Sequence, residues 1–402
     1  MKILNRKIHW FNPGHEEAIR TDNPYYTPPA SVCKMMDDLA MLPLWYGNEN
    51  DCVIVNETYE TSRFLLSLPT DIRPAVAPIL PSALHISEPI ESAPWGLSPQ
   101  SIHYFETLRI KNENITVPQW NEKYKELTSR QFACKCLTKL CTLLPDSFKT
   151  LTMPRFCSTM EEIREFISVC PPPYMLKTPY SCSGRGLYRL PACDLDLTAN
   201  RWINGALKKQ GAISIERFLD KVCDFAMEFE SDGNGHITFK GLAVFNTYSR
   251  GIYSGNLLGS QHILEKHLSA FCQIESIHTL QNTITPLLAE TLGNDYQGYF
   301  GVDMMIYRNE NTYSIHPLVE INLRYTMGLV ALQLSNRLIH PSSHGQLIIT
   351  FNKEKNTTYR AHLEMQATYP LLLSETKIQS GYLALCPVTP ETQYHAYILI
   401  EN

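Results

Sequence analysis

The segment that most constrains the fold of this chain is YFGVDMMIYRNENTYSIHPLVEINLRY, residues 299–325. Two apolar runs flank the polar sequence Asn309–Asn311, and this pattern predicts a β-hairpin. Folding the chain about Asn311 brings Asp303 opposite the region Pro317–Glu320. Because the surrounding residues are apolar, the second strand is expected to be buried. A buried carboxylate then needs a metal or a cation as its partner.

The hairpin carries a set of oxygen-bearing side chains. Glu320 and Asn322 are two residues apart, so they project from the same face of the predicted strand. With Asp303 they bring two carboxylates and one carboxamide oxygen to one patch, a set that suits Mg²⁺ together with waters and nucleotide phosphates. Arg324 follows two residues later and is expected on the same face. The alternative is that these residues form the solvated face of an exposed hairpin.

A second motif, YMLKTPYSCSGRG (residues 174–186), places a lysine, Lys177, between a short apolar run and a loop of Ser and Gly. Glycines near a lysine suggest phosphate binding, but the order is not that of a P-loop. In a P-loop the lysine follows the glycines and opens a helix. Taken alone, the motif is interpreted as an ordinary strand and turn.

The first 125 or so residues alternate between predicted strands and helices. The β-type run at residues 6–12 ends in a turn signal, a helical pattern covers residues 31–45, and residues 51–56 read as a short buried strand. The proline-rich segment 69–98 is interpreted as irregular. This alternation predicts a small α/β domain with a parallel sheet. The segment Asn12–Glu16 lies at a strand end, where it either helps to recognise substrate or forms a plain strand-to-helix turn.

The rest of the chain reads as an alternation of helices and strands with two hairpins. The predicted elements are a helix from Ser129 that stops at Pro145, a helix with a capping box at Ser158 and Glu161, strands at 174–177, 186–190 and 212–219, a hairpin over 224–245 with Asp-Gly-Asn-Gly at its tip, a helical region over about 256–293, the hairpin described above, and several strands over 346–402.

Composition excludes some classes of protein. The 402 residues carry a net charge of −5, which argues against a nucleic-acid-binding protein dominated by a basic field. No apolar run approaches the roughly 20 residues of a membrane helix, and the first residues lack the apolar segment of a signal peptide. The 12 cysteines are scattered without a C-x-x-C pair. We therefore expect reduced thiols and a cytoplasmic protein.

Four motifs, taken in order, resemble those of the ATP-grasp superfamily: LKTPYSCSGRG, IERFLDKVCDF, GYFGVDMMIY and LVEINLRYTMG. The resemblance covers roughly residues 129–330 and implies an α/β and α+β architecture. An N-terminal α/β domain with a parallel sheet (residues 1–125) is followed by an ATP-grasp fold of two α+β subdomains, 126–212 and 213–402. The FNP, YTPP and DLAMLPLWY runs of the first domain resemble those of an uncharacterised bacterial ATP-grasp group, which names no substrate.

The resemblance also implies roles for individual residues. Lys177 would contact the phosphates of ATP, and the loop after it would close over them. A further phosphate-contacting lysine is expected on the helix from Ser129, with Lys135 as the first choice and Lys139 as the alternate. Glu216 is either part of the adenine site or an ordinary strand-face acid. The implied set is Ser181, Ser183, Gly184 and Gly186 in the loop, Glu216, Arg217, Phe218 and Leu219 at the adenine, Asp224 at the ribose, Asp303, Glu320 and Asn322 at Mg²⁺ or Mn²⁺, and Lys177 and Arg324 in catalysis.

The function implied is that of a Mg-ATP-dependent ligase of the carboxylate–amine or carboxylate–thiol type. ATP would phosphorylate a substrate carboxylate to an acyl phosphate, and an amine or similar nucleophile would displace the phosphate. The expected partners are a small-molecule or peptide carboxylate and an amine, with no nucleic acid and no membrane; the sequence leaves open whether the chain forms a homodimer. Two alternatives remain, a nucleotide-binding regulatory module without ligation and a small-molecule kinase.

Overall fold

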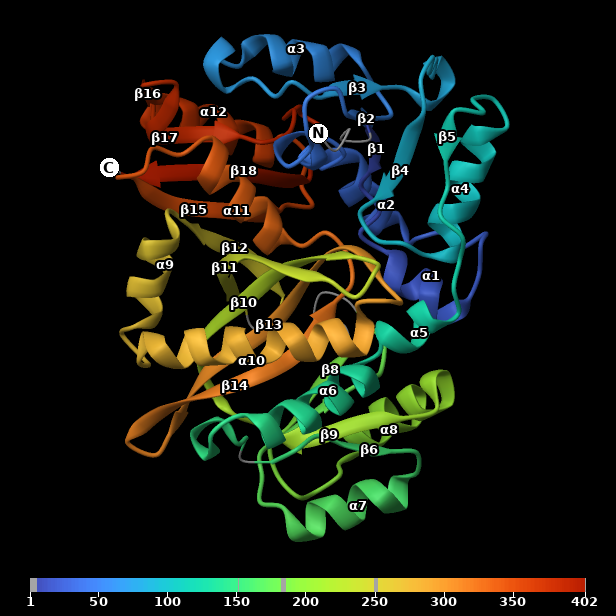
Figure 1. Cartoon of the computed structure of the whole chain (residues 1–402), viewed down its shortest axis with the longest axis vertical. Coiled ribbons are helices and arrows are strands. Elements are labelled where there is room, and N and C mark those ends of the chain that lie inside the picture. Colours follow the sequence, from blue (N-terminus) through green and yellow to red (C-terminus); the bar gives the residue numbers. More distant parts are fainter. Residues whose placement is uncertain (1–5, 151, 182–185, 249–251, 402) are drawn as a thin grey trace. The chain divides into compact units, whose positions relative to one another are not determined.

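The computed structural model describes residues 6–150, 152–181, 186–248 and 252–401 of the chain, and Figure 1 shows the order of its helices and strands. The chain divides into two compact units. Unit 1 consists of Met1–Asn121, Ser254–Leu264 and Arg324–Asn402, and unit 2 of Glu122–Tyr253 and Glu265–Leu323. The boundary at residue 121 lies close to the predicted end of the first domain at 125. The segment 213–402, predicted as one subdomain, is shared between the two units.

Unit 1 contains a five-stranded parallel sheet, which confirms the predicted N-terminal α/β fold. Its strands are β1 (Lys7–Trp10), β2 (Cys52–Ile54), β3 (Ala77–Ile79), β4 (Ile90–Pro94) and β5 (Ile115–Thr116). They lie in the order β3-β2-β1-β4-β5, with every pair parallel. The prediction that residues 69–98 are irregular is wrong, because β3 and β4 lie there. Pro94 stands at the last position of β4, opposite Trp10, so its missing N–H interrupts the ladder only at the strand end.

A second set of strands in unit 1 confirms the predicted strands of the C-terminal region. The strands are β12 (Tyr253–Leu258), β15 (His344–Phe351), β16 (Leu372–Ser374), β17 (Lys377–Ala384) and β18 (Tyr394–Glu401). They are antiparallel, in the order β12-β15-β18-β17-β16. A helix within this region was missed by the sequence analysis, because α12 (Thr357–Thr368) buries only Thr358 and so shows little apolar periodicity.

The remaining helices of unit 1 surround these sheets. They are α1 (His15–Thr21), α2 (Ala30–Asp38), α3 (Tyr59–Ser67), α4 (Pro99–Arg109) and α11 (Met327–Arg337), with short 3₁₀ helices η1 (Leu42–Trp45), η2 (Thr70–Ile72) and η3 (Pro81–Ala83). The helix α9 (Gln261–Leu268) crosses the boundary between the units.

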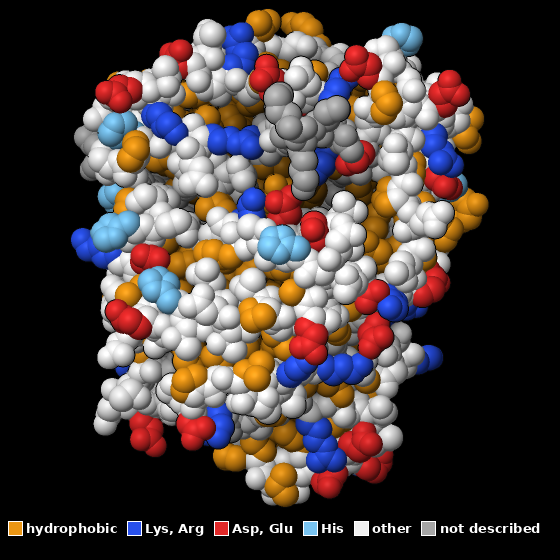
Figure 2. All heavy atoms as spheres, viewed as in Figure 1, with side chains coloured by type: hydrophobic (Ala, Val, Ile, Leu, Met, Phe, Trp, Pro, Cys, Tyr) orange, Lys and Arg blue, Asp and Glu red, His pale blue; other side chains and the backbone are white. Residues whose placement is uncertain are grey.

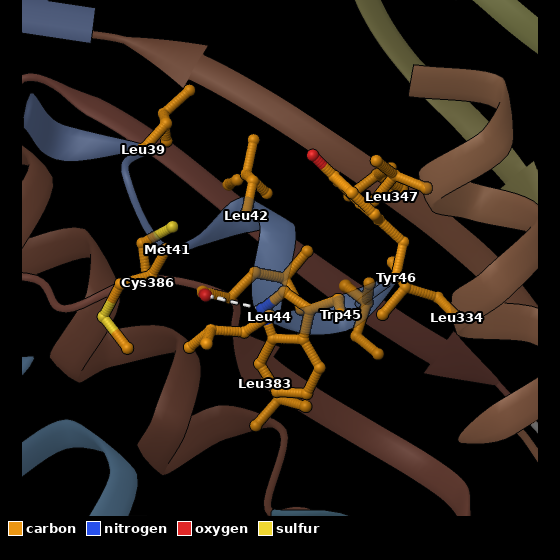
Figure 3. Packing of buried hydrophobic residues seen from close by; sticks show 14 of the residues in the cluster. Leu39, Met41, Leu42, Leu44, Trp45, Tyr46, Leu334, Leu347, Leu383 and Cys386 are labelled. Carbon is orange, nitrogen blue, oxygen red and sulfur yellow. Dashed lines mark hydrogen bonds between the residues drawn. The ribbon is translucent and has the colours of Figure 1, made fainter. Parts of the chain in front are cut away.

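The main core of unit 1 joins segments that are far apart in the sequence. Figure 3 shows Leu42 and Leu44 packed near Leu347 and Leu383 of the C-terminal strands. At the centre of this cluster the Trp45 indole donates a 2.7 Å hydrogen bond to the carbonyl of Leu385. All the labelled hydrophobic residues in Figure 3 belong to one buried cluster. The N-terminal part of unit 1 therefore depends on residues after Arg324 for its core.

Unit 2 contains a four-stranded antiparallel sheet with helices on one face. Its strands are β6 (Arg155–Cys157), β7 (Tyr174–Lys177), β8 (Leu187–Leu190) and β9 (Ile213–Arg217), and its helices are α7 (Met160–Val169) and α8 (Leu197–Gln210). The order is β6-β9-β7-β8. Tyr174 and Leu176 of β7 pack in one core with Ile163 and Phe166 of α7 and Ile203 of α8. The strands predicted at 174–177, 186–190 and 212–219 are confirmed.

The predicted capping box of α7 is displaced by one residue. We expected Ser158 and Glu161, but Thr159 caps the helix and Glu162 completes the box. Both pairs fit the motif in sequence. When Thr159 caps the helix, the Ile163 side chain lies in the buried core.

The second part of unit 2 is built from two hairpins, both predicted from the sequence. The strands are β10 (Asp220–Asp232), β11 (Ile237–Thr247), β13 (Gln297–Asn309) and β14 (Thr312–Asn322), in the order β14-β13-β10-β11. The helices of this part are α5 (Lys123–Leu127), α6 (Arg130–Leu143), α10 (Ile274–Leu292) and the 3₁₀ helix η4 (Asp146–Phe148).

The helical region expected over 256–293 is only partly correct. It begins with strand β12, and a break separates α9 from α10. Gly259 adopts a φ of 156°, which a helix does not accommodate, and it separates β12 from α9. The helix predicted from Ser129 is confirmed, because α6 starts after the Ser129 cap and ends at Leu143, before Pro145.

Basic and acidic side chains are interspersed on the face shown in Figure 2. No large area of this face carries charge of one sign only. This distribution agrees with the net charge of −5. Among the residues described, none of the helices has both the length and the apolar character needed to cross a bilayer.

Candidate active site

Lys177 and Glu216 lie on the face of the four-stranded sheet that points away from α7 and α8. In β7 the side chains alternate, so Leu176 enters the helix-covered core and Lys177 projects from the opposite face. The Lys177 ammonium pairs with the Glu216 carboxylate on the neighbouring strand β9. Their side chains are only 13% and 8% exposed, respectively. A buried lysine with a single carboxylate partner is suited to exchange that partner for another anion.

A small pocket in unit 2 is built around this pair. The pocket volume is about 20 Å³, roughly enough for one water molecule. Its walls come from α6, β6, β7, β9 and β14. The lining residues are Arg130, Ala133, Cys134, Leu137, Pro154, Phe156, Lys177, Ser214, Glu216, His316, Leu318 and Val319.

Arg130, the first residue of α6, connects the parts of this site. Its guanidinium donates 2.7 and 2.8 Å hydrogen bonds to the Thr178 carbonyl and the Ser181 hydroxyl, which lie at the start of the Gly/Ser loop. The same group forms a 2.9 Å ion pair with Glu320 on β14. Arg130 is 9% exposed. Arg130 therefore lines the pocket together with Lys177 and connects it to the loop stem and to Glu320 of the hairpin.

The hairpin brings the predicted metal ligands together. Asp303 lies directly opposite Glu320, at the end of the predicted region Pro317–Glu320, and a bulge lies between Asp303 and Met305. The Asn322 side-chain amide donates a 2.9 Å hydrogen bond to the Asp303 carboxylate, so the three side chains form one patch. Within the described ranges, no group of three or more His, Cys, Asp and Glu residues has the arrangement of a metal site. Two carboxylates and one carboxamide nevertheless fit the oxygen chemistry of Mg²⁺, which takes its other ligands from phosphate and water.

His316 lines the pocket from β14 and is 3% exposed. Burial lowers the pKa of His316 to about 4, so the imidazole is neutral at physiological pH. Its Nδ1 atom has no hydrogen-bond partner among the described residues. A single histidine next to Pro317 carries no motif, so the sequence does not predict His316 as a site residue.

Two of the predicted loop residues, Ser183 and Gly184, lie outside the described residues. The two others mark the ends of the loop. Ser181 accepts the hydrogen bond from Arg130, and the Gly186 carbonyl accepts a 2.9 Å hydrogen bond from the Thr178 amide. A Cβ atom at Gly186 would collide with the Thr178 hydroxyl oxygen and the Ser181 side chain. The loop thus closes at a point where the backbone requires glycine.

Replacing Gly186 with Ala is expected to lower the free energy of unfolding by about 1–3 kcal/mol, because the added methyl group forces Thr178 and Ser181 apart. Chemical denaturation measures this difference. Gly205→Ala in α8 is the matched control, since a Cβ there meets nothing within 4 Å. We expect that control to stabilise unit 2 slightly, by up to about 1 kcal/mol. Equal unfolding free energies for Gly186→Ala and the wild type would show that the stem of the loop yields without cost.

The residues proposed for the nucleoside lie on β9, on β10 and in the connection between these strands. The Glu216 side chain lines the pocket. The Phe218 amide donates a 2.7 Å hydrogen bond to the Pro173 carbonyl. The Leu219 carbonyl accepts a 2.9 Å hydrogen bond from the Lys221 amide.

Asp224 pairs with Lys221 and accepts a hydrogen bond from Thr247. Burial raises the pKa of Asp224. Arg217 is the last residue of β9, opposite Tyr174. The structure therefore groups Glu216 with Lys177 and leaves Asp224 in a separate polar cluster.

The two lysines chosen on α6 point elsewhere. Lys135 pairs with Glu126 at 2.8 Å and is 68% exposed, whereas Lys139 pairs with Glu290 at 2.7 Å. Neither lines the pocket. Arg130 is the positively charged residue of α6 that lines the pocket. It was not predicted from the sequence. A signal existed, because a cation in the first turn of a helix opposes the helix dipole and therefore indicates a tertiary anionic partner.

Arg324 lies in unit 1, where its guanidinium forms a 3.0 Å ion pair with Glu16 of α1. The same guanidinium donates a hydrogen bond to the carbonyl of Tyr325. Its side chain is 21% exposed. In the sequence it follows Asn322 by two residues.

No protein-family model and no curated protein matches this sequence. Solved structures do match its fold. The biotin carboxylase domain of 2-oxoglutarate carboxylase from Hydrogenobacter thermophilus, in complex with MgADP, ADP and bicarbonate, aligns with a TM-score of 0.54 at 12% identity, over 98% of this chain and 85% of that chain. Biotin carboxylase from Campylobacter jejuni, with an ATP analogue, gives 0.54 at 11% identity over 98% and 87%.

An ADP complex of N5-carboxyaminoimidazole ribonucleotide synthetase gives a TM-score of 0.51 at 11% identity, over 100% of this chain and 94% of that chain. Identities this low show the fold alone. The five-stranded parallel sheet at the N-terminus, together with antiparallel sheets, is consistent with these structures. The chain therefore has the fold of the ATP-grasp enzymes.

Proposed function

We propose that the protein is a Mg-ATP-dependent ligase that activates a substrate carboxylate for attack by an amine or a similar nucleophile. The observation that supports this most is a pocket of unit 2 lined by two cations, Lys177 and Arg130, of which Arg130 pairs with Glu320 of the acidic hairpin. Phosphate groups require cations, and a nucleotide-bound Mg²⁺ requires carboxylates. Both are present in one site, as phosphoryl transfer demands.

In this proposal the residues of the chain bind and orient charges. Asp303, Glu320 and Asn322 would hold Mg²⁺, which supplies charge neutralisation at the phosphate oxygens when bound. Lys177 and Arg130 would exchange their carboxylate partners, Glu216 and Glu320, for phosphate oxygens, and Glu320 would then hold Mg²⁺. Arg324 would offset negative charge on the phosphoryl group as it reaches the substrate carboxylate. No side-chain nucleophile is needed, because positioning and electrostatics supply most of the catalysis in such reactions.

Mg-ATP is expected to raise the melting temperature of the protein. At a nucleotide concentration about 100 times Kd the stabilisation should approach 2.7 kcal/mol. Lys177→Ala should weaken binding by roughly 1.5–3 kcal/mol, or about 10–150-fold, because a charged hydrogen bond to phosphate is lost. Isothermal titration with Mg-ATP measures the difference. Lys149→Ala, an exposed change next to Asp146, is the control. A wild-type protein that Mg-ATP does not stabilise would contradict the proposal.

Two other functions fit parts of the site. A regulatory nucleotide-binding module would use the Lys177 pocket but has little use for the acidic hairpin. A small-molecule kinase would use both and release no acyl phosphate. Substrate-dependent ADP release separates an enzyme from a binding module, and the linkage in the product, read by mass spectrometry after incubation with ATP and a pooled metabolite extract, separates a ligase from a kinase.

A further inference from the structure

A second pocket, much larger than the one around Lys177, is built entirely from residues of unit 1. Its volume is about 380 Å³, against about 20 Å³ for the pocket of unit 2. Pockets for small organic ligands begin at roughly 300 Å³. The walls come from α3, α12, β17 and the short segments that follow them, and Figure 1 shows α3 next to α12 and β17. The pocket is therefore large enough for a molecule of metabolite size.

One wall is β17, and the chain that leaves α12 passes close over this strand. Gly381 of β17 has a φ of 109°, and a Cβ atom there would collide with the Pro370 carbonyl oxygen. The Tyr382 amide donates a 2.9 Å hydrogen bond to the Tyr369 carbonyl beside it. Such a close approach of two backbone segments requires glycine. The wall formed by residues 369–371 is thus fixed by the backbone itself, and the pocket is preformed.

The face of α12 that borders the pocket is polar. His362 and Gln366 lie one helical turn apart, and both line the pocket. The helix packs against β17, yet Thr358 is its only buried residue. A helix that covers a core normally turns an apolar stripe towards it. Here two side chains with hydrogen-bonding groups occupy that position, which is the pattern of a helix that borders a binding site.

A chain of hydrogen bonds leads from His362 into the core. The His362 Nδ1 lies 2.6 Å from the Tyr382 hydroxyl, which lies 2.7 Å from the His395 Nε2. Tyr382 and His395 are each 4% exposed, and Tyr397 stacks on the His395 ring with centroids 4.9 Å apart. The buried Nδ1 of His395 has no hydrogen-bond partner among the described residues. The Nε2 of His362, whose ring lines the pocket, has none among them either.

The number of protons gives this chain a direction. Burial lowers the pKa of His362 and lowers that of His395 to about 3, so each imidazole is neutral at physiological pH and carries one N–H. The Tyr382 hydroxyl has one proton to donate, so it must accept from the other imidazole. Buried N–H groups without an acceptor are rarer than unsatisfied acceptors, which favours an unprotonated Nδ1 on His395. His395 then donates to Tyr382, Tyr382 donates to His362, and the His362 Nε2–H remains as a donor on the pocket wall.

The other residues of the lining favour an uncharged aromatic ligand. None of the described residues that line the pocket is Lys, Arg, Asp or Glu. A charged group would lose hydration there without gaining an ion pair. Aromatic rings reach the pocket from three elements, with Phe64 on α3, Tyr369 after α12 and Tyr382 on β17. Such rings stack on a flat aromatic molecule or meet its edge, so the pocket combines aromatic contact area with one N–H donor.

We propose that this pocket binds an uncharged aromatic molecule that carries a hydrogen-bond acceptor, of the class of aromatic carboxamides, lactams and lactones. The His362 Nε2–H donates to the acceptor, and Phe64 and Tyr369 contact the aromatic ring. Gln366 offers a second polar group on the same wall. The proposal does not depend on the ligase reaction, because every lining residue belongs to unit 1 and none of them lines the pocket around Lys177.

Ligand-observed NMR with the full-length protein tests the site. The neutral probes are benzamide, nicotinamide, oxindole and coumarin. Benzoate and benzylamine are the charged counterparts of benzamide, and cyclohexanecarboxamide is the non-aromatic one. We expect at least one neutral aromatic probe to bind the wild type more tightly than its counterparts.

Three variants locate the binding. Ser67→Trp should abolish it, because the indole fills the space beside Phe64 at the end of α3. Ser62→Trp on the same helix, exposed and outside the pocket, is the matched control and should bind like the wild type. His362→Phe keeps a ring of similar size and removes the donor, so it should weaken binding roughly three- to tenfold. Thermal melting verifies that each variant is folded.

The proposal fails if none of the neutral aromatic probes binds, if binding survives Ser67→Trp, or if benzoate or benzylamine displaces benzamide from the same site. Unchanged affinity in a folded His362→Phe variant would remove the donor from the site and overturn the proposed ligand class. Size-exclusion chromatography examines another occupant, a second copy of the chain. A wild-type dimer that Ser67→Trp converts to a monomer, and Ser62→Trp does not, would show that the pocket is an interface and would also overturn the proposal.

Discussion

Replacing Glu320 with Gln, or Asp303 with Asn, is expected to abolish ATP turnover, with a loss of roughly 10³-fold or more. Each change removes an anionic oxygen ligand that Mg²⁺ needs, and the charge neutralisation that the ion provides is worth several kcal/mol. The amides are close in size to the acids and retain hydrogen-bonding oxygens, so the hairpin should remain folded. Mg-dependent ADP release in the presence of the carboxylate substrate measures the effect, and thermal melting verifies the fold.

A matched control is available on α10. Glu290, which is 66% exposed and pairs with Lys139, should tolerate substitution by Gln with unchanged turnover. Near-normal, Mg-dependent ADP release by either Glu320→Gln or Asp303→Asn would remove these residues from the metal site. Glu320→Gln also weakens the ion pair with Arg130, so a change in melting temperature restricted to this variant reports the contribution of that pair.

Arg324→Ala is expected to lower turnover by about 10²–10³-fold, or about 2.7–4 kcal/mol, like the removal of one well-placed donor to a developing negative charge. Arg324→Lys should restore little of this activity, because an ammonium group does not reproduce the planar fork of the guanidinium. Hydroxylamine provides the readout, since it intercepts acyl phosphates and gives a hydroxamate with the carboxylate substrate. The wild type should form the hydroxamate, and Arg324→Ala should suppress it.

Two outcomes would redirect this assignment. An unchanged rate in Arg324→Ala would assign the residue a structural role as the partner of Glu16. A phosphorylated product that resists hydroxylamine would favour the small-molecule kinase. Arg337→Ala is a suitable control, because the Arg337 guanidinium donates a hydrogen bond to the carbonyl of Gly47 in unit 1 and carries no proposed role in catalysis.

The parts of the fold that the sequence predicted are those with local signals. The hairpin about Asn309–Asn311 combines apolar strands with a polar turn. Counting outward from that turn brings Asp303 to the predicted region Pro317–Glu320, and the bulge between Asp303 and Met305 sets Glu320 as its partner. The lysine strand β7 and the helix α6 carry similarly local signals, a short apolar run and a serine cap. In each of these cases short-range chemistry and the tertiary fold agree.

The parts that could not be predicted depend on distant partners. Arg130 joins the loop stem to Glu320 across 190 positions of sequence, and its own segment shows only a helix start. His316 lines the pocket because other elements pack on β14 and bury this part of the strand. The strand β4 lies in a proline-rich segment and is recognised only through its pairing with β1. Local propensity does not contain such information.

The discontinuous core of unit 1 has a consequence for how the protein is made. A ribosome releases residues 1–121 first, but the partners of Leu42 and Trp45 on β15, β17 and the segment after it come from the last part of the chain. At about 5–20 residues per second, synthesis of residues 324–402 takes roughly 4–16 s. Over that interval the N-terminal segment has no complete core, whereas all of unit 2 has already been translated. We therefore expect unit 2 to fold first on the ribosome, and the nascent N-terminal part of unit 1 to rely on chaperones until its partners in residues 324–402 are made.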